Sequence, residues 1–263
     1  MIANYHTHTF RCGHAGGTDR EYVEAAIAGG LRILGFADHT PFPGEDEGCG
    51  MEPGELAGYV ESILRLKEEY EDHIALFVGL EVENCPTQFH TLLKMLKGYP
   101  LDYLILGQHA VFGIPGYRGS VNRTKEAYIF EAYCEQAAEG MQSGVFSCWA
   151  HPDIIHFAGD DALYEKKMRQ LCRIANEQRL PLEINFKGIS QRRNYPDDRF
   201  WRIAGEENCR VVFGCDAHHP DDLRNLAEPL KAARTIVQKH HLRVEEQIVL
   251  KGLGTLKKGL EDG

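Results

Sequence analysis

Seven short apolar runs alternate with longer amphipathic segments along the sequence, and this alternation limits the folds open to the chain. The runs are rich in β-branched and aromatic residues, and they cover 2–8, 32–39, 74–83, 101–109, 145–153, 180–186 and 210–219. Strands that are apolar almost throughout, each followed by a helical pattern, are typical of buried parallel strands covered by helices. The sequence therefore predicts an α/β fold. We expect one domain over 1–263, because no linker or low-complexity segment divides the chain.

Two α/β architectures accommodate seven strand–helix units of this length. One is a distorted (β/α)7 barrel, a TIM-like relative of the eight-stranded type, and the other is an open doubly wound sheet. The hydrophobic pattern is the same in both, so periodicity alone does not choose between them.

The residues at the strand ends favour the barrel. Six of the seven runs end in side chains that can bind a metal ion: His6 and His8, Asp38 and His39, Glu81 and Glu83, His109, His151 and Asp153, and Asp216 with His218 and His219. The carboxyl ends of all strands in a parallel barrel share one face, so these groups would converge there. The single crevice of an open sheet has less room for contributions from six strands. We therefore expect metal-binding side chains at the carboxyl-terminal mouth of a barrel.

The stretch NYHTHTF near the start of the chain contains the first of these groups. His6 and His8 are two residues apart, so in an extended strand both imidazoles point to the same side. An isolated pair of this kind is as often two hydrogen-bonded surface histidines as it is a metal site. His14 follows in RCGHAGG, where small residues allow the loop to fold over the barrel mouth.

Several polar neighbours are expected to support these ligands rather than to bind metal. Asp38 and Asp153 are candidates to orient a metal-bound imidazole, as carboxylates often do. Glu83, two residues after Glu81, suits either role. Cys215 should point away from the side that Asp216 faces and lie in the core.

Charge and composition exclude several functional classes. The net charge is −10 and no basic stripe occurs, which argues against nucleic-acid binding. No apolar run reaches the length of about 18 residues that a membrane-spanning helix needs, and the first residues lack the pattern of a signal peptide. The eight cysteines lie in apolar segments without a CxxC pair, which indicates reduced, buried thiols. We therefore expect a cytoplasmic protein without nucleic-acid or membrane partners, and the sequence leaves the oligomeric state open.

The motifs resemble those of a known family. HTHTFRCGHAGG, FADHTPFP, GLEVE, GQHA, AHPD and GCDAHHP are similar in order and spacing to the polymerase-and-histidinol-phosphatase (PHP) superfamily, and most closely to its histidinol-phosphatase branch. The resemblance extends from His6 to His218. It implies a distorted (β/α)7 barrel with a metal cluster, commonly of three ions, at the carboxyl-terminal mouth.

The resemblance also implies three sets of metal ligands. The first metal would take His6, His8 and Asp216 and share Glu81 with a second metal at His109 and His151, while His14, His39 and His218 would hold a third. Imidazole and carboxylate ligands suit divalent Zn, Mn or Fe and do not distinguish among them. We expect Glu81, Asp216 and His218 to be catalytic, and we identify no thiolate ligand.

From this resemblance we expect a metal-dependent phosphomonoesterase that acts on a small-molecule phosphate ester. The family branch implies hydrolysis of L-histidinol phosphate to L-histidinol and phosphate in histidine biosynthesis. One alternative is a PHP phosphoesterase acting on another small phosphate ester or a nucleotide. Another is an amidohydrolase-type barrel hydrolase, although a third set of ligands would be superfluous in a two-metal enzyme. A non-enzymatic metal-binding protein would not need an open cluster at a barrel mouth.

Substrate contacts are expected from loops around the mouth. The sixth run, LPLEINF, carries no clear metal ligand, and the loop after it contains Arg192 and Arg193, either of which could fork onto phosphate. Arg118 and Arg123 follow His109 and are further candidates. The acidic residues after the second run could meet the ammonium or imidazole of histidinol phosphate; these are Glu45, Asp46, Glu47 and Glu52. Solvated loop charge is the competing explanation for each of these residues.

Overall fold

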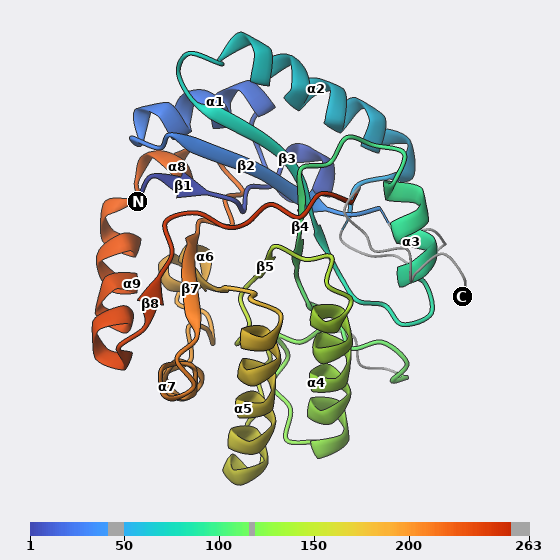
Figure 1. Cartoon of the computed structure of the whole chain (residues 1–263), viewed down its shortest axis with the longest axis vertical. Helices are drawn as coiled ribbons and strands as arrows, with labels where there is room; N and C mark the ends of the chain where they lie inside the picture. Colours follow the sequence, from blue (N-terminus) through green and yellow to red (C-terminus); the bar gives the residue numbers. More distant parts are fainter. Residues whose placement is uncertain (42–49, 116–118, 254–263) are drawn as a thin grey trace.

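The computed structural model describes residues 1–41, 50–115 and 119–253 of the chain. Within these ranges, one sheet of parallel strands follows the chain order and curls around a central axis (Figure 1). The strands are β1 (Ala3–Asn4), β2 (Ile33–His39), β3 (Ala75–Val82), β4 (Tyr103–Leu106), β5 (Cys148–Trp149), β6 (Leu182–Asn185), β7 (Arg210–Gly214) and β8 (Arg243–Val244). The prediction of a distorted TIM-like barrel is confirmed.

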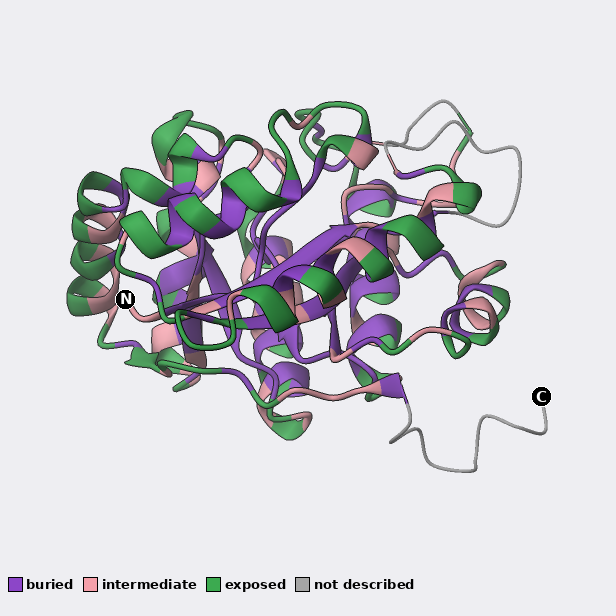
Figure 2. Ribbon diagram, turned by 90° about the horizontal axis from the view of Figure 1, so that it is seen from above, coloured by how far each residue is buried: buried purple, intermediate pink, exposed green. Residues whose placement is uncertain are grey.

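Helices connect the strands and cover the outside of the sheet, with their exposed faces turned to solvent (Figure 2). They are α1 (Asp19–Ala28), α2 (Leu56–Glu69), α3 (Phe89–Leu96), α4 (Ala127–Gln142), α5 (Asp161–Glu177), α6 (Phe186–Ser190), α7 (Asp198–Glu206), α8 (Asp221–Arg224) and α9 (Ala227–His240), with short 3₁₀ helices η1 (Phe10–Cys12) and η2 (Pro53–Glu55). The start of α1 is fixed by a capping box, in which Thr18 and Glu21 each satisfy the other's backbone N–H. Across the residues with described placement, no helix is both long and apolar enough to cross a membrane.

The strand count differs from the expected seven. β8 pairs in parallel with β7 through Arg210↔Arg243 and Val211↔Val244. Both residues of β8 are exposed, so no apolar run marks this strand in the sequence. Its existence therefore depends on pairing with β7 rather than on burial of its own side chains.

The ends of β1 and β7 meet at the carboxyl-terminal mouth. Just beyond the two strands, Thr7 and Ala217 form a parallel bridge. The N–H of His8 donates to the carbonyl of Ala217 at 2.9 Å, and the N–H of Ala217 donates to the carbonyl of His6 at 3.3 Å. This bridge brings the first and last metal-binding motifs of the sequence side by side.

Two groups of apolar side chains lie on opposite faces of the strands. Outward residues such as Leu34 and Phe36 belong to the large cluster shared with the helices. Inward residues such as Ala37 and Tyr103 form a smaller cluster inside the sheet. The Tyr103 ring requires glycine beneath it, because a Cβ added at Gly79 would lie 2.4 Å from the ring. Its hydroxyl donates to the carbonyl of Tyr5 at 2.7 Å, which ties β4 to the residue that follows β1.

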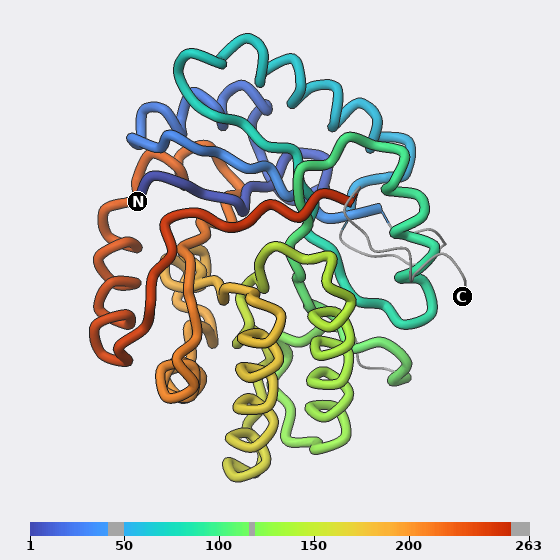
Figure 3. The backbone as a smooth tube through the Cα atoms, in the orientation of Figure 1, coloured from blue at the N-terminus to red at the C-terminus, as the bar shows by residue number. Residues whose placement is uncertain are grey.

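The segment after β8 crosses the molecule and closes the inner cluster. It is the red segment that passes in front of the strands in Figure 3. Ile248 and Leu250 pack against the inner side chains, and the N–H of Lys251 donates to Ser147 Oγ at 2.8 Å. This segment therefore covers the apolar interior on one side. The polar inward residues at the other ends of the strands line the opposite mouth.

Candidate metal centre

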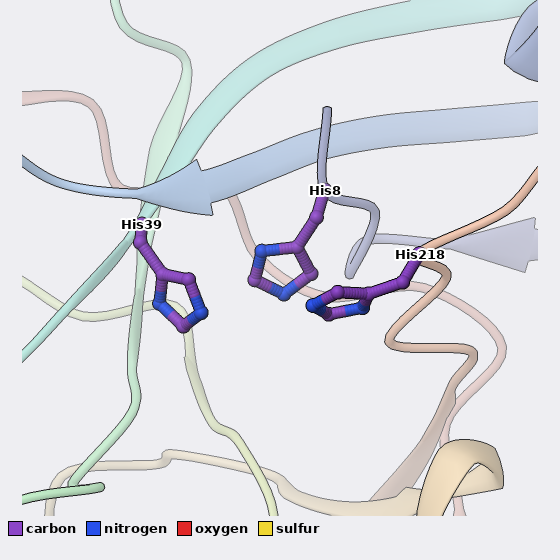
Figure 4. A group of neighbouring side chains, drawn as sticks. All are labelled: His8, His39 and His218. Carbon is purple, nitrogen blue, oxygen red and sulfur yellow. The ribbon is translucent and has the colours of Figure 1, made fainter. Parts of the chain in front are cut away.

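Histidines from distant parts of the chain point toward one another at the barrel mouth. Figure 4 shows His8, His39 and His218, which come from the segment after β1, the end of β2 and the segment after β7. The ring centroid of His8 lies 4.4 Å from that of His39 and 4.1 Å from that of His218. His8 and the carboxylates around it are buried. Several sets of ligand atoms lie within 4.8 Å of one another, close enough to hold a metal ion.

Glu81 lies among imidazoles of all three predicted sets: Oε1 faces the second set, and Oε2 faces the first set and His39 of the third. Oε1 is 2.8 Å from His151 Nε2 and 3.7 Å from His109 Nε2. Oε2 is 3.1 Å from His39 Nδ1 and 3.5 Å from the Nε2 atoms of both His6 and His8. Within the described ranges this buried Oε2 accepts no hydrogen bond, although a buried carboxylate oxygen normally has a partner. Such an oxygen, surrounded by imidazole nitrogens, fits a metal ligand.

His6 and His8 lie beside the carboxylate of Asp216, which follows β7. The Nε2 atoms of His6 and His8 are 3.1 Å apart. Asp216 Oδ1 is 3.2 Å from His8 Nε2 and 3.7 Å from His6 Nε2. Both imidazoles face the same side, as the two-residue spacing predicts, and the bridge between Thr7 and Ala217 brings Asp216 to them.

The members of the third predicted set lie at a more exposed part of the centre, where His218 is grouped with His14 and Cys12 and also with His39 and His8. His14 Nε2 lies 2.9 Å from His218 Nε2, and the rings of His14 and His39 have centroids 5.4 Å apart. One neighbour of this set was not predicted: the sulfur of Cys12 lies within 4.8 Å of ligand nitrogens of His14 and His218. Its position two residues before His14 was the only available signal. The nine predicted metal-binding residues therefore gather at one mouth.

Carboxylates outside the ligand sets fix the Nδ1 atoms of three imidazoles. Glu183 Oε1 is 2.8 Å from His6 Nδ1 and Glu83 Oε1 is 2.9 Å from His109 Nδ1. Asp38 Oδ1 is 3.4 Å from His8 Nδ1. A carboxylate on Nδ1 leaves Nε2 free to face a metal, and it sets the orientation of the ring. Glu83 is thus placed to orient rather than to bridge, and Asp38 has the contact expected of it.

Two further expectations about polar residues have different outcomes. Asp153 accepts a hydrogen bond from the N–H of Asp197 at 2.6 Å, so its carboxylate supports the start of α7 instead of orienting an imidazole. Cys215 is buried in the outer apolar cluster, as expected of a residue that points away from Asp216.

The sixth strand contributes more than its sequence indicated. Glu183 and Asn185 alternate with apolar residues and are both buried. Glu183 Oε2 accepts from the N–H of His151 at 3.0 Å, and Asn185 Nδ2 donates to Asp216 Oδ2 at 3.1 Å. The period-two alternation within LPLEINF was the signal that could have placed Glu183 and Asn185 on the inner face.

A lysine on this side was also missed. Lys187 Nζ lies 2.9 Å from His218 and 3.6 Å from Asp216 Oδ1. Arg192 and Arg193, the arginines expected after this strand, are exposed. Arg193 donates to Gln191 Oε1 at 2.9 Å and to the hydroxyl of Tyr195 at 3.2 Å. The backbone of Arg192 is in the left-handed region, with a φ of +53°.

Other expected substrate contacts have no described position near the mouth. Arg118 lies outside the described residues, as do Glu45, Asp46 and Glu47. The N–H of Glu52 is bonded to the Glu55 carboxylate in the cap of η2, and Arg123 is exposed.

Burial and opposite charge compete in setting the pKa values of the cluster. Burial lowers the pKa of His6, but three surrounding carboxylates outweigh it and raise that pKa well above 6.5. Burial and the adjacent His218 ring lower the pKa of His8 well below 6.5. Burial raises the pKa of Glu81, but the surrounding imidazoles dominate and hold it well below its usual range. The centre thus keeps charged carboxylates in a buried place, where a cation is favoured.

Comparison with known proteins agrees with these observations. The family model described as PHP domain matches residues 4–187. A probable histidinol-phosphatase of Deinococcus radiodurans is 28% identical over 89% of this chain and 94% of its own length. The histidinol-phosphatase of Bacillus subtilis is 25% identical over 83% and 94%. A histidinol phosphate phosphatase of Lactococcus lactis, solved with zinc, L-histidinol and phosphate, has a TM-score of 0.72 at 20% identity and covers 98% of this chain and 99% of that one.

Proposed function

The chain belongs to the PHP domain family, and from this membership we propose that it is a metal-dependent phosphomonoesterase that hydrolyses L-histidinol phosphate in histidine biosynthesis. The relatives named for this activity cover most of the chain. The observation that carries the proposal is the position of Glu81, whose two oxygens face different imidazoles. A carboxylate placed in this way suits a bridge between two metals, and paired metals suit hydrolysis of phosphate esters.

We assign three metal positions per chain to the mouth. They are His6, His8, Asp216 and Glu81 Oε2 for the first, His109, His151 and Glu81 Oε1 for the second, and His14, His39 and His218 for the third. Imidazole nitrogens and carboxylate oxygens suit Zn, Mn and Fe. Zinc is our first choice, since the Lactococcus lactis structure contains it.

When bound, divalent ions at these positions would activate water and offset the negative charge on the phosphoryl oxygens. The chain's own residues have distinct parts in this chemistry. Glu81 and Asp216 hold the negative charge that retains the metals, while Glu183, Glu83 and Asp38 keep the imidazoles oriented. His218 is our candidate for proton transfer, because its Nδ1 lies 3.3 Å from Asp216 Oδ1. Cys12 is buried beside the third set. We assign the attack on phosphorus to water, which divalent ions at these positions would activate.

Arg193 is our first candidate among the expected arginines for an outer contact with the substrate. Its guanidinium bonds the hydroxyl of Tyr195, and the Tyr195 ring lies 5.9 Å from that of His151. Arg192, which is exposed, and Arg118, which lies outside the described residues, rank behind it.

Steady-state kinetics on a panel of phosphate monoesters with defined metals tests the proposed function. We expect kcat/KM for L-histidinol phosphate to exceed that for nucleotides and sugar phosphates by at least about tenfold, or about 1.4 kcal/mol in the transition state. A better nucleotide or other ester would instead identify a different PHP phosphoesterase. Hydrolysis of amides but not of phosphate esters would reject the proposal.

A further inference from the structure

Lys187 occupies a place in the mouth that the metal sets do not explain. It lies in the first turn of α6, directly after β6, and the Asn185 side chain fixes this turn by accepting from the N–H of Gly188 at 2.9 Å. Its ammonium is 2.9 Å from both Nδ1 and Nε2 of His218, so it sits against the imidazole. The side chain is only 13% exposed. A largely buried ammonium in a fixed position needs a negative partner.

Asp216 is the nearby carboxylate, but its oxygens have other neighbours. Oδ1 lies 3.6 Å from Lys187 Nζ and 3.2 Å from His8 Nε2, and Oδ2 accepts from Asn185 Nδ2 at 3.1 Å. If Asp216 holds a metal, as proposed above, its charge is shared between that ion and the ammonium. Two cationic groups then lie close to the same carboxylate. An anion bound between them would relieve their repulsion.

We propose that Lys187 binds the phosphoryl group of the substrate, on the side of the mouth formed by Asp216 and His218. A phosphate monoester is a dianion, and its oxygens accept charge-assisted bonds from an ammonium. Lysine is a compact point charge with three rotatable donors, so it can follow an oxygen as the phosphoryl group moves during hydrolysis. Arg193, in contrast, contacts Gln191 and Tyr195, outside the ligand sets. This inference rests on the proposed phosphatase activity but not on histidinol phosphate as the substrate.

The decisive experiment compares Lys187→Met with the parent, both saturated with zinc. Inorganic phosphate is the probe, and its dissociation constant is measured by calorimetry and as a product-inhibition constant. We expect Lys187→Met to weaken phosphate binding at least about tenfold, the scale of a bond to a charged group. Metal content should stay equal to that of the parent. Lys187→Arg keeps the charge and should retain part of the affinity.

A matched control removes a lysine outside the mouth. Lys67 on α2 pairs with Asp102 and is 39% exposed, so Lys67→Met changes the net charge equally and should leave phosphate binding unchanged. Unchanged phosphate affinity in a folded, metal-loaded Lys187→Met would overturn the inference. Loss of metal in both Lys187 variants would also overturn it, because Lys187 would then hold the ligands rather than the substrate.

The choice of esters separates this inference from the proposed function. Kinetics are measured with L-histidinol phosphate and with 4-nitrophenyl phosphate. If only the aryl ester is hydrolysed and Lys187→Met raises its KM, the named substrate is wrong and the phosphate contact stands. If L-histidinol phosphate is hydrolysed and Lys187→Met leaves KM and phosphate inhibition unchanged, the activity stands and the contact is wrong.

Discussion

Glu183 Oε1 lies 2.8 Å from Nδ1 of His6, so a carboxylate on β6 fixes an imidazole that follows β1. The two side chains are 177 positions apart in the sequence, and both are almost fully buried. Glu183 also accepts from the N–H of His151 and from Asn185. One side chain therefore supports two of the proposed metal sets.

We predict that Glu183→Gln weakens metal binding. The amide keeps the shape but loses the charge that orients His6, and changes of this kind cost about 10-fold to 100-fold in metal affinity. Competition with a chromophoric chelator measures the affinity directly. Glu177→Gln, at an exposed position near the end of α5, is the control. Equal affinities in the two variants would contradict the assigned role.

Glu81 should matter more than Glu83, its neighbour on the same strand face. Glu81→Gln removes a charge that faces several imidazoles, and we expect kcat/KM to fall by at least about a hundredfold. Glu83→Gln removes only an orienting contact with His109, so its loss should be several times smaller. If Glu83→Gln proves as damaging as Glu81→Gln, the assignment of bridge and orienting carboxylate fails.

Metal content should exceed one ion per chain and approach three at saturation. Elemental analysis of zinc-loaded protein gives the ratio, and thermal unfolding with and without a chelator gives the effect on stability. Removal of metal leaves buried imidazoles and carboxylates without their ions, so we expect a lower Tm. Full activity at a single equivalent of metal would refute the three-site assignment.

The sequence was most informative about side chains that can bind metal and that directly follow a strand. The histidines and carboxylates at the strand ends converge because parallel strands share one carboxyl-terminal edge, so candidate ligands could be named from the sequence. Their division into three sets came from the resemblance to the PHP superfamily and remains a proposal. It was less informative where polar residues are hidden in apolar runs. Glu183 looked like part of a buried strand, and only its alternation with Leu182 and Ile184 marks it as inward.

Other features depend on tertiary contacts that no local pattern records. β8 is a two-residue strand that exists through pairing with β7. Lys187 lies in a stretch whose sequence is typical of a basic loop. Arg192 and Arg193 were the expected phosphate contacts there, because a guanidinium can form two parallel bonds to phosphate. The short helix α6 turns Lys187 into the mouth and leaves Arg192 and Arg193 exposed. The choice among cations therefore depended on a local helix that the sequence did not predict.

Asp153 should make stability depend on pH. Burial raises the pKa of its carboxyl from 3.8 to about 7 in the folded protein. The folded state thus binds more protons than the unfolded state between these values, so the free energy of unfolding falls as pH rises from about 4 to 7. Asp153→Asn removes this contribution. The free energy of unfolding of the variant, relative to that of the parent, should therefore rise by on the order of 2–4 kcal/mol between pH 4 and pH 7.

Urea unfolding of the metal-free proteins across this pH range measures the difference. Asp72→Asn, at an exposed position, controls for the change in net charge. A difference between Asp153→Asn and the parent that is constant with pH would show that the carboxyl titrates at its ordinary pKa.

The two arginines after β6 should differ in their effect on catalysis. Arg193 reaches Tyr195, which packs near His151, whereas Arg192 is exposed. Replacement by lysine keeps the charge but removes the fork, so a guanidinium that contacts the ester should not be replaceable without loss. We therefore expect Arg193→Lys to lower kcat/KM for phosphate esters by about tenfold, the scale of one bond to a charged group, while Arg192→Lys stays close to the parent. Metal content should be the same in both variants, because neither residue belongs to a ligand set. If both variants match the parent enzyme, this loop carries solvated charge, and Lys187 with the metals must hold the phosphoryl group without an arginine from it.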